Sequence, residues 1–243
     1  MLHRLELRCA GEGDPLILVH GIQGNAEAWA SILPVLGKES RCVMPNLPGR
    51  KFSARWRPQD GAIEDFYSLG HYAQILAELV RHYSDSCRRP VALAGWSMGV
   101  SVILEYAQRF GLASVSRIVL CSGTPKAADG ALWFKSDSLE GLVGEAQQRA
   151  LRLGLKDPAD HEAVAWSWKS VLAADHVQVL PRIFVPTLVI HGERDDDCPI
   201  AHGQRMANDI TGAQWCPLPG VGHSIFGEAA EEVGQAMATF LHG

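Results

Sequence analysis

Several features that would point to particular functions are scarce or absent in this 243-residue chain. Its 22 Lys and Arg residues are outnumbered by 27 Asp and Glu residues, so it lacks the basic excess typical of nucleic-acid-binding proteins. No run of about 20 apolar residues is present to span a bilayer, and no basic start followed by an apolar run predicts a secretion signal. We therefore expect a cytoplasmic protein with no nucleic-acid or membrane partner.

The cysteines also lack a functional pattern. The six residues, at positions 9, 42, 87, 121, 198 and 216, show none of the short paired spacings of a zinc site or a redox motif. Several lie in apolar runs, where a free thiol packs as a small hydrophobic group. We expect no bound metal and no cofactor.

What is present fits a single α/β domain with one sizeable core, since hydrophobic residues make up 47% of the chain and charged residues 20%. Continuous apolar runs predict strands buried on both faces of a parallel sheet. These runs lie at residues 16–19, 91–94, 118–121 and 187–190. Alternating apolar and polar residues over 2–9 predict an edge strand.

Helical periodicity separates these predicted strands. Apolar residues recur every three or four positions over 69–83 and 233–241, and alternating strands and helices indicate a doubly wound α/β fold with a mostly parallel sheet. Residues 125–180 break this alternation, because they contain helix-forming residues and no strand-like run. We therefore expect a core made of residues 1–124 and 181–243, with a helical insertion at 125–180.

The most informative motif is the segment Gly95-Trp96-Ser97-Met98-Gly99, which follows a predicted strand and precedes a helical stretch. A serine with glycine two residues before and two residues after it fits a sharp strand-to-helix turn that exposes the hydroxyl group. Glycine suits both positions, since a Cβ atom would collide where strand and helix backbones approach each other.

Further motifs follow other predicted strands. His20-Gly21 comes after the first buried run, Asp195 lies in the segment after the run at 187–190, and His223 lies in a glycine-rich segment near the C-terminus. Ser97, Asp195 and His223 thus occur in the chain order serine, acid, histidine.

With these motifs, the chain resembles the α/β-hydrolase family along almost its whole length. The matching pieces are HG at 20–21, NLPG at 46–49, GWSMG at 95–99, GERD at 192–195 with a proline at 199, and GH at 222–223. Within the family it looks most like the serine esterase and thioesterase branch, which includes pimeloyl-carrier-protein methyl ester esterases. The resemblance implies an α/β-hydrolase fold in which the insertion at 125–180 is a small lid over the active site.

The residues support roles for a nucleophile, a base and an orienting acid. Ser97 needs a base to accept its proton, and His223 can accept it near neutral pH. Asp195 would orient the imidazole and stabilise its protonated form. Asp196 and Asp197 are alternatives for this acid, but Asp195 has the family's spacing from Gly192, and no acidic residue between Cys121 and Asp129 offers another position.

The oxyanion of the tetrahedral intermediate requires backbone N–H donors. We expect these from Met98, directly after the nucleophile, and from Ile22, with Gln23 as a less favoured substitute. His20 and His191 each end a strand before a glycine, so a supporting role in a turn is favoured over proton transfer.

Aromatic residues indicate an apolar acyl group in the substrate. Trp96 follows Gly95 in the strand-to-helix turn, and the insertion carries Trp133, Phe134, Trp166 and Trp168. We expect Trp96, Trp133 and Phe134 to contact the substrate, while packing of the insertion against the core explains these rings equally well.

One segment departs from the family pattern. Four cations, Arg50, Lys51, Arg55 and Arg57, lie within eight residues and could bind a phosphate-bearing carrier such as a phosphopantetheine arm or coenzyme A. Asp60, Glu64 and Asp65 reduce this positive charge, so a solvated loop is the favoured interpretation. Cys198, three residues after Asp195, could be modestly reactive, although a packing role is favoured.

Together these observations predict a serine hydrolase that cleaves a carboxylic ester or thioester through an acyl-enzyme. The expected substrate is a small acyl compound that a carrier protein or coenzyme A could bear. We expect the protein to act as a monomer or homodimer. Carbon–carbon bond hydrolysis or cofactor-free peroxidation with the same residues remain alternatives. A non-catalytic binding protein is a more remote one. A metallohydrolase built on His191, Asp195, His202 and His223 is disfavoured, because these residues lack the usual ligand spacing.

Overall fold

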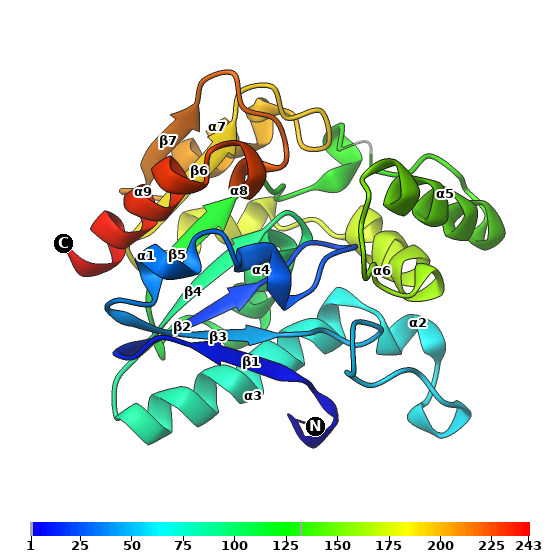
Figure 1. Cartoon of the computed structure of the whole chain (residues 1–243), viewed down its shortest axis with the longest axis horizontal. Coiled ribbons are helices and arrows are strands. Elements are labelled where there is room, and N and C mark those ends of the chain that lie inside the picture. Colours follow the sequence, from blue (N-terminus) through cyan, green and yellow to red (C-terminus); the bar gives the residue numbers. More distant parts are fainter. Residues whose placement is uncertain (1, 132) are drawn as a thin grey trace.

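The computed structural model describes residues 2–131 and 133–243. At its centre lies a seven-stranded sheet with the strand order β1-β3-β2-β4-β5-β6-β7 (Figure 1). Its strands are β1 (Leu7–Ala10), β2 (Asp14–Val19), β3 (Ser40–Pro45), β4 (Val91–Trp96), β5 (Val115–Cys121), β6 (Thr187–Gly192) and β7 (Gln214–Leu218). β1 runs antiparallel to β3 and all other neighbours are parallel, which confirms the predicted mostly parallel sheet.

The edge strand is shorter than the sequence pattern predicts. Residues Leu2–Arg4 form a 3₁₀ turn, η1, instead of extending the strand. The partner strand β3 ends at Pro45, which pairs with Leu7, so the residues before Leu7 lie beyond the end of the β1–β3 ladder. The Arg4 side chain instead reaches Asp60, with 2.6 Å between Nη1 and Oδ1.

Helices cover both faces of the sheet, as a doubly wound fold requires. On β2, Ile17 and Val19 pack into one core and Leu16 and Leu18 into the other. The first core is covered by α3 (Leu69–Cys87), α4 (Met98–Phe110) and α7 (Ile200–Asp209), and the second by α1 (Leu33–Leu36), α8 (Ile225–Glu228) and α9 (Ala230–His242). Figure 1 shows α3 and α9 on opposite sides of the sheet.

The segment between β5 and β6 contains helices joined by irregular stretches, and no strand among its described residues. It contains η4 (Ala127–Asp129), α5 (Leu139–Arg152), α6 (His161–Ala173) and η5 (Val177–Arg182). The predicted insertion also includes Leu132, which lies outside the described residues. α5 and α6 pack against each other beside one end of the sheet (Figure 1).

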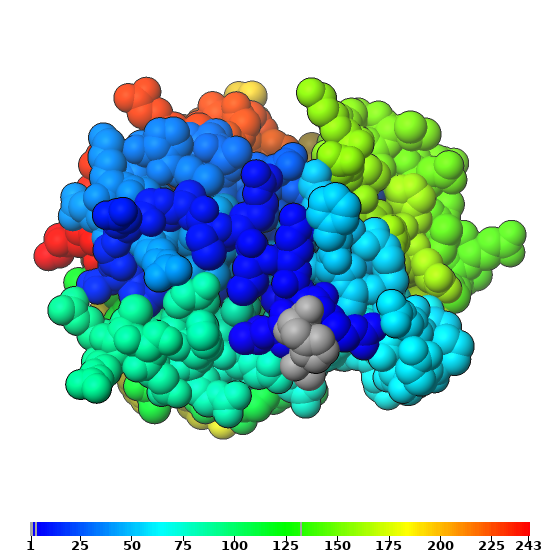
Figure 2. Space-filling model, turned by 60° about the horizontal axis from the view of Figure 1, so that its bottom comes forward, coloured from blue at the N-terminus to red at the C-terminus, as the bar shows by residue number. Residues whose placement is uncertain are grey.

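Ion pairs join this segment to the loops that follow β3. Lys51 pairs with Asp157 at 2.7 Å, and Arg55 pairs with Asp160 at 2.9 Å. Figure 2 shows the insertion, in yellow-green, beside this light-blue part of the chain, which includes η3 (Pro58–Asp60) and α2 (Ile63–Phe66).

A further short turn, η2 (Ala26–Trp29), follows β2. Among the described residues, no helix combines the length and apolar character needed to cross a membrane.

The turn between β4 and α4 depends on close backbone contacts. A Cβ atom added to Gly95 would lie 2.5 Å from the carbonyl carbon of Gly99, and one added to Gly99 would lie 2.1 Å from the carbonyl oxygen of Val19. These separations are shorter than van der Waals contact, so a larger residue would push α4 away from β2 and β4.

We predict that Gly99→Ala lowers the free energy of unfolding by about 1–3 kcal/mol, because the added methyl group overlaps the β2 backbone. Gly144→Ala in α5 is the control, since no atom lies within 4 Å of its added Cβ. It should raise stability by about 0.5–1 kcal/mol. Urea unfolding of both variants measures the difference, and equal effects would contradict the packing described here.

Candidate active site

Ser97 lies at the turn between β4 and α4, with φ 57° and ψ −121°. A positive φ is rare for a residue other than glycine and is retained where the surrounding structure enforces it. The side chain is 3% exposed and lines a cavity. The local geometry is therefore that of the sharp strand-to-helix turn expected from the Gly95–Gly99 motif.

The structure brings together Ser97, His223 and Asp195, which lie at the carboxyl ends of different strands. Ser97 Oγ is 3.0 Å from His223 Nε2, and His223 Nδ1 is 2.9 Å and 3.0 Å from the two carboxylate oxygens of Asp195. In this arrangement Nδ1–H donates to Asp195, which leaves Nε2 to accept the hydrogen bond from the Ser97 hydroxyl. The three side chains form one continuous hydrogen-bonded chain.

Asp195 differs from its two acidic neighbours in burial. Its carboxylate is buried, and Oδ1 accepts hydrogen bonds from the backbone N–H groups of Asp197 at 3.0 Å and Cys198 at 2.7 Å. Asp196 is exposed, and Asp197 is half-buried. Of the three aspartates, Asp195 alone faces Nδ1 of His223 among the described contacts.

His191 supports the loop that carries Asp195. Its Nε2–H donates to the carbonyl oxygen of Cys198 at 2.7 Å, and the side chain is fully buried. Burial lowers the pKa of His191, so the neutral ring is favoured. This contact agrees with the expected supporting role.

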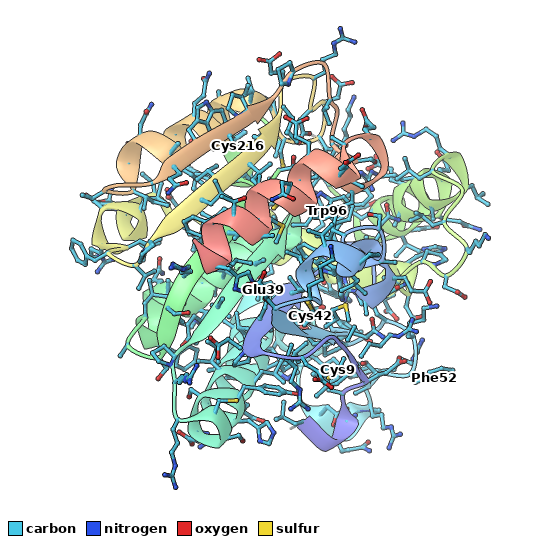
Figure 3. The ribbon with its side chains drawn as sticks, turned by 60° about the vertical axis from the view of Figure 1, so that its left-hand side comes forward. Cys9, Glu39, Cys42, Phe52, Trp96 and Cys216 are labelled. Carbon is cyan, nitrogen blue, oxygen red and sulfur yellow. The ribbon has the colours of Figure 1, made fainter. Side chains whose placement is uncertain are left out.

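Cys198 lies in the same loop but is not exposed to solvent. Burial raises the pKa of its thiol well above the ordinary value, so the reactive thiolate is disfavoured. The suggestion of modest reactivity is therefore wrong, and the packing role fits. Figure 3 shows three other free cysteines, Cys9, Cys42 and Cys216, on β1, β3 and β7.

A buried histidine supports the turn after β2. His20 Nδ1–H donates to the carbonyl oxygen of Gly21 at 2.7 Å, and Nε2 accepts from the backbone N–H of Leu47 at 3.1 Å. Burial, aided by the nearby Arg50 charge, lowers the pKa of His20 to about 3. His20 therefore stays neutral and acts as a hydrogen-bonded support for the turn that carries Ile22.

Arg50 was expected in a solvated loop, and this expectation is wrong because its side chain is completely buried. Its guanidinium donates to the carbonyl oxygen of Ile22 at 2.6 Å, to that of Pro48 at 2.6 Å and to the Tyr72 hydroxyl at 2.8 Å. The buried guanidinium thus holds in place the peptide group that joins Ile22 to Gln23. Lys51 and Arg55 pair with acidic groups of the insertion, as described above.

Ile22 and Met98, the expected oxyanion donors, lie in the turn after β2 and at the start of α4. Ile22 lines the same cavity as Ser97. Met98 is the first residue of α4, so its N–H has no carbonyl partner within the helix, and its side chain is fully buried in the core. A helix N-terminus also carries partial positive charge, which favours an anion beside it.

The cavity above Ser97 has a volume of about 440 Å³. Trp96 and Trp133 line it, whereas Phe134 is not among its described lining residues and packs against Trp168, with ring centroids 5.7 Å apart. Of the three aromatic residues expected to contact substrate, two therefore face the cavity. Trp96 also donates from Nε1 to the carbonyl oxygen of His223 at 3.2 Å and packs against Phe226 of α8.

Sequence reasoning missed a link between this cavity and α5. Arg149 on α5 pairs with Asp197 and donates to Gln23 Oε1 at 2.8 Å, while Gln23 Nε2 donates to the carbonyl oxygen of Ala146 at 2.7 Å. No local motif marks Arg149, because it is one of two arginines in the last turn of an amphipathic helix. The Gln23 side chain thus binds the insertion, whereas the oxyanion role considered above concerns its backbone N–H.

The histidines proposed as metal ligands make other contacts. His202 Nδ1 is 2.9 Å from the Thr124 hydroxyl, and His191 binds the Cys198 carbonyl group. Within residues 2–131 and 133–243, no group of three or more His, Cys, Asp or Glu side chains is arranged to hold a metal ion. A larger depression of about 670 Å³, lined in part by Arg4, His71 and Arg109, contains none of the site residues.

We predict a specific pH dependence of stability from His20. Between about pH 6.5 and pH 3 the unfolded chain binds a proton at this side chain and the folded protein does not, so stability falls as the pH falls. His20→Gln should reduce the slope of unfolding free energy against pH in this range by up to about 1.4 kcal/mol per pH unit. Denaturant unfolding at several pH values measures it, with His82→Gln, at an exposed position of α3, as control. Equal slope changes in both variants would contradict the assignment.

Comparisons with known proteins identify the family and the fold. The chain is 25% identical to a putative non-heme chloroperoxidase of Synechocystis sp., over 95% of this chain and 92% of that protein. It is 26% identical to a pimeloyl-[acyl-carrier protein] methyl ester esterase of Nitrosospira multiformis, over 91% and 92%. The fold matches an esterase from Exiguobacterium antarcticum with a TM-score of 0.81 at 20% identity, covering 98% and 96% of the two chains. A sequence model of the alpha/beta hydrolase family matches residues 16–236, and the protein belongs to this family.

Proposed function

We propose that this protein is a serine hydrolase that cleaves a carboxylic ester or thioester with an apolar acyl group. The observation that carries the proposal is the unbroken hydrogen-bonded chain from Ser97 through His223 to the buried Asp195, which opens into a cavity at Ser97. This order of groups provides a nucleophile, a general base and an orienting acid.

In the first half of the reaction, Ser97 Oγ attacks the carbonyl carbon of the substrate while its proton passes to His223 Nε2. Asp195 stabilises the resulting imidazolium through Nδ1–H. The backbone N–H groups of Ile22 and Met98 bind the oxyanion of the tetrahedral intermediate. The C–O or C–S bond then breaks, and the leaving group takes the proton from His223.

In the second half, water attacks the acyl group on Ser97. His223 takes a proton from this water as the new bond forms and returns it to Ser97 Oγ as the ester bond breaks. The carboxylic acid product leaves, and the site returns to its starting protonation state. No cofactor takes part in these reaction steps.

The apolar residues that line the cavity support an apolar acyl group. Trp96, Trp133, Leu153 and Leu155 line it, and the last three belong to the segment 125–180, which we propose acts as a lid. The similarity to a pimeloyl-[acyl-carrier protein] methyl ester esterase supports an acyl substrate that a carrier could bear. The exposed Lys156 at the cavity adds a positive charge near which an anionic carrier group would be favoured.

A second candidate is cofactor-free peroxidation, favoured by the similarity to a putative non-heme chloroperoxidase. The same triad would first form an acyl-enzyme, and hydrogen peroxide would replace water as the acceptor. Hydrolysis in the absence of peroxide separates the two functions.

We predict that the wild-type protein hydrolyses p-nitrophenyl esters and acyl thioesters of graded acyl length, and that Ser97→Ala lowers turnover by at least about 10³-fold. Steady-state kinetics across this panel measures both substrate class and chain-length preference. Unchanged hydrolysis by Ser97→Ala, or turnover only when peroxide is present, would contradict the proposed function.

Substitution of each of the three neighbouring aspartates should affect kcat differently. Asp195→Asn should lower kcat by about 10³–10⁴-fold, because His223 loses the partner that fixes its tautomer and stabilises its charge. Asp196→Asn is the matched control at an exposed position, and it should retain wild-type turnover. Asp197→Asn should lose far less than Asp195→Asn at neutral pH. Equal losses in all three variants would contradict the assignment of the acid.

A further inference from the structure

A second carboxylate lies close to the atom of His223 that accepts the Ser97 proton. Asp197 Oδ2 is 3.8 Å from His223 Nε2, on the opposite side of the ring from Asp195. The Asp197 side chain is 20% exposed and that of His223 is 13% exposed, so water only partly screens the two groups. The mechanism proposed above gives Asp197 no role.

An uncompensated carboxylate at this position would oppose general-base catalysis. A negative charge within about 4–6 Å favours the protonated form of a histidine. Asp195 provides this effect at Nδ1, where it stabilises the imidazolium that forms during the reaction. A second carboxylate beside Nε2 would stabilise an N–H bond on the atom that must be free to accept the Ser97 proton.

Arg149 supplies the compensating charge. Its guanidinium forms an ion pair with Asp197, and its side chain is 11% exposed. The same guanidinium donates to Gln23 Oε1, and the Gln23 amide in turn donates to the carbonyl oxygen of Ala146 on α5. Gln23 is buried, so it fixes Arg149 in place from the side of the β2 loop.

Other charged and titratable groups around His223 are already paired or lie further away. They are Asp195 and His191 from the β6 side, Glu228, which accepts from the N–H of Gly222, and Glu27, Lys156 and Asp157 around the cavity. Glu27 and Asp157 both pair with Lys51. Within the described contacts, Asp197 is the carboxylate that approaches Nε2, and Arg149 is the cation that pairs with it.

We propose that Arg149 is a positioning residue of the active site, which neutralises Asp197 and so keeps His223 available as a base. This inference rests on the proposed serine hydrolase function. Because Arg149 belongs to α5, the insertion contributes an electrostatic element to the catalytic machinery as well as a wall of the cavity. Displacement of α5 would leave the Asp197 charge beside Nε2, so more of His223 would be protonated and unable to accept the Ser97 proton.

The pH–rate profile tests this proposal. In Arg149→Gln, the pH at which kcat/KM falls to half on the acidic side should rise by about one unit, the low end of the effect of a carboxylate at this distance. Arg149→Lys should restore much of the wild-type profile, because the charge is kept. The double variant Arg149→Gln/Asp197→Asn should return the acidic limb close to its wild-type position, because both charges are removed. Arg152→Gln, at an exposed position of the same helix, is the matched control and should leave the limb unchanged.

A titration that needs no turnover separates this inference from the proposed function. In ¹⁵N-histidine NMR spectra, assigned with a His223→Gln variant, the midpoint of the His223 titration should move to higher pH in Arg149→Gln and return in the double variant. An unchanged midpoint, or a uniform loss of activity at every pH, would overturn the role of Arg149. If the Ser97→Ala variant instead turned over substrate at the wild-type rate, the proposed function would be overturned, whatever the titration shows.

Discussion

A buried carboxylate must be compensated by hydrogen-bond donors, because an unpaired charge in a protein interior costs several kcal/mol. Asp195 meets this requirement with the N–H groups of Asp197 and Cys198 and with the His223 ring. These contacts tie the loop after β6 to the loop after β7. The orientation of His223, and therefore the direction of its Nε2 atom toward Ser97, depends on them.

The other half of the site depends on close packing rather than charge. Ser97 keeps a positive φ because glycines on both sides let α4 approach β2 and β4 closely. The same approach places the N-terminus of α4 beside the turn that carries Ile22. Hydrogen bonds from neutral His20 and from the fully buried Arg50 hold that turn in place. Two separate supports, one electrostatic and one steric, therefore meet at the serine hydroxyl.

The sequence predicted those parts of the molecule that depend on local pattern. The runs at 91–94 and 187–190 lie within β4 and β6, since buried parallel strands are continuously apolar. β3 and β7 were missed, because polar residues and prolines interrupt their apolar pattern. The chain order of motifs was sufficient to select Ser97, Asp195 and His223. Arg50, Arg149 and Phe134 were not predictable in this way, because tertiary contacts from distant segments decide whether such side chains face solvent, the core or the cavity.

We propose that Ser97 is the activated nucleophile of this α/β hydrolase. Reaction with a fluorophosphonate probe, followed by mass spectrometry of the digested protein, tests it directly, since such probes bond covalently to serines that have an adjacent base. We expect a single modified peptide that carries the probe on Ser97, with labelling strongly slowed in His223→Gln. Modification at another residue, or no modification of the folded wild-type protein, would contradict it.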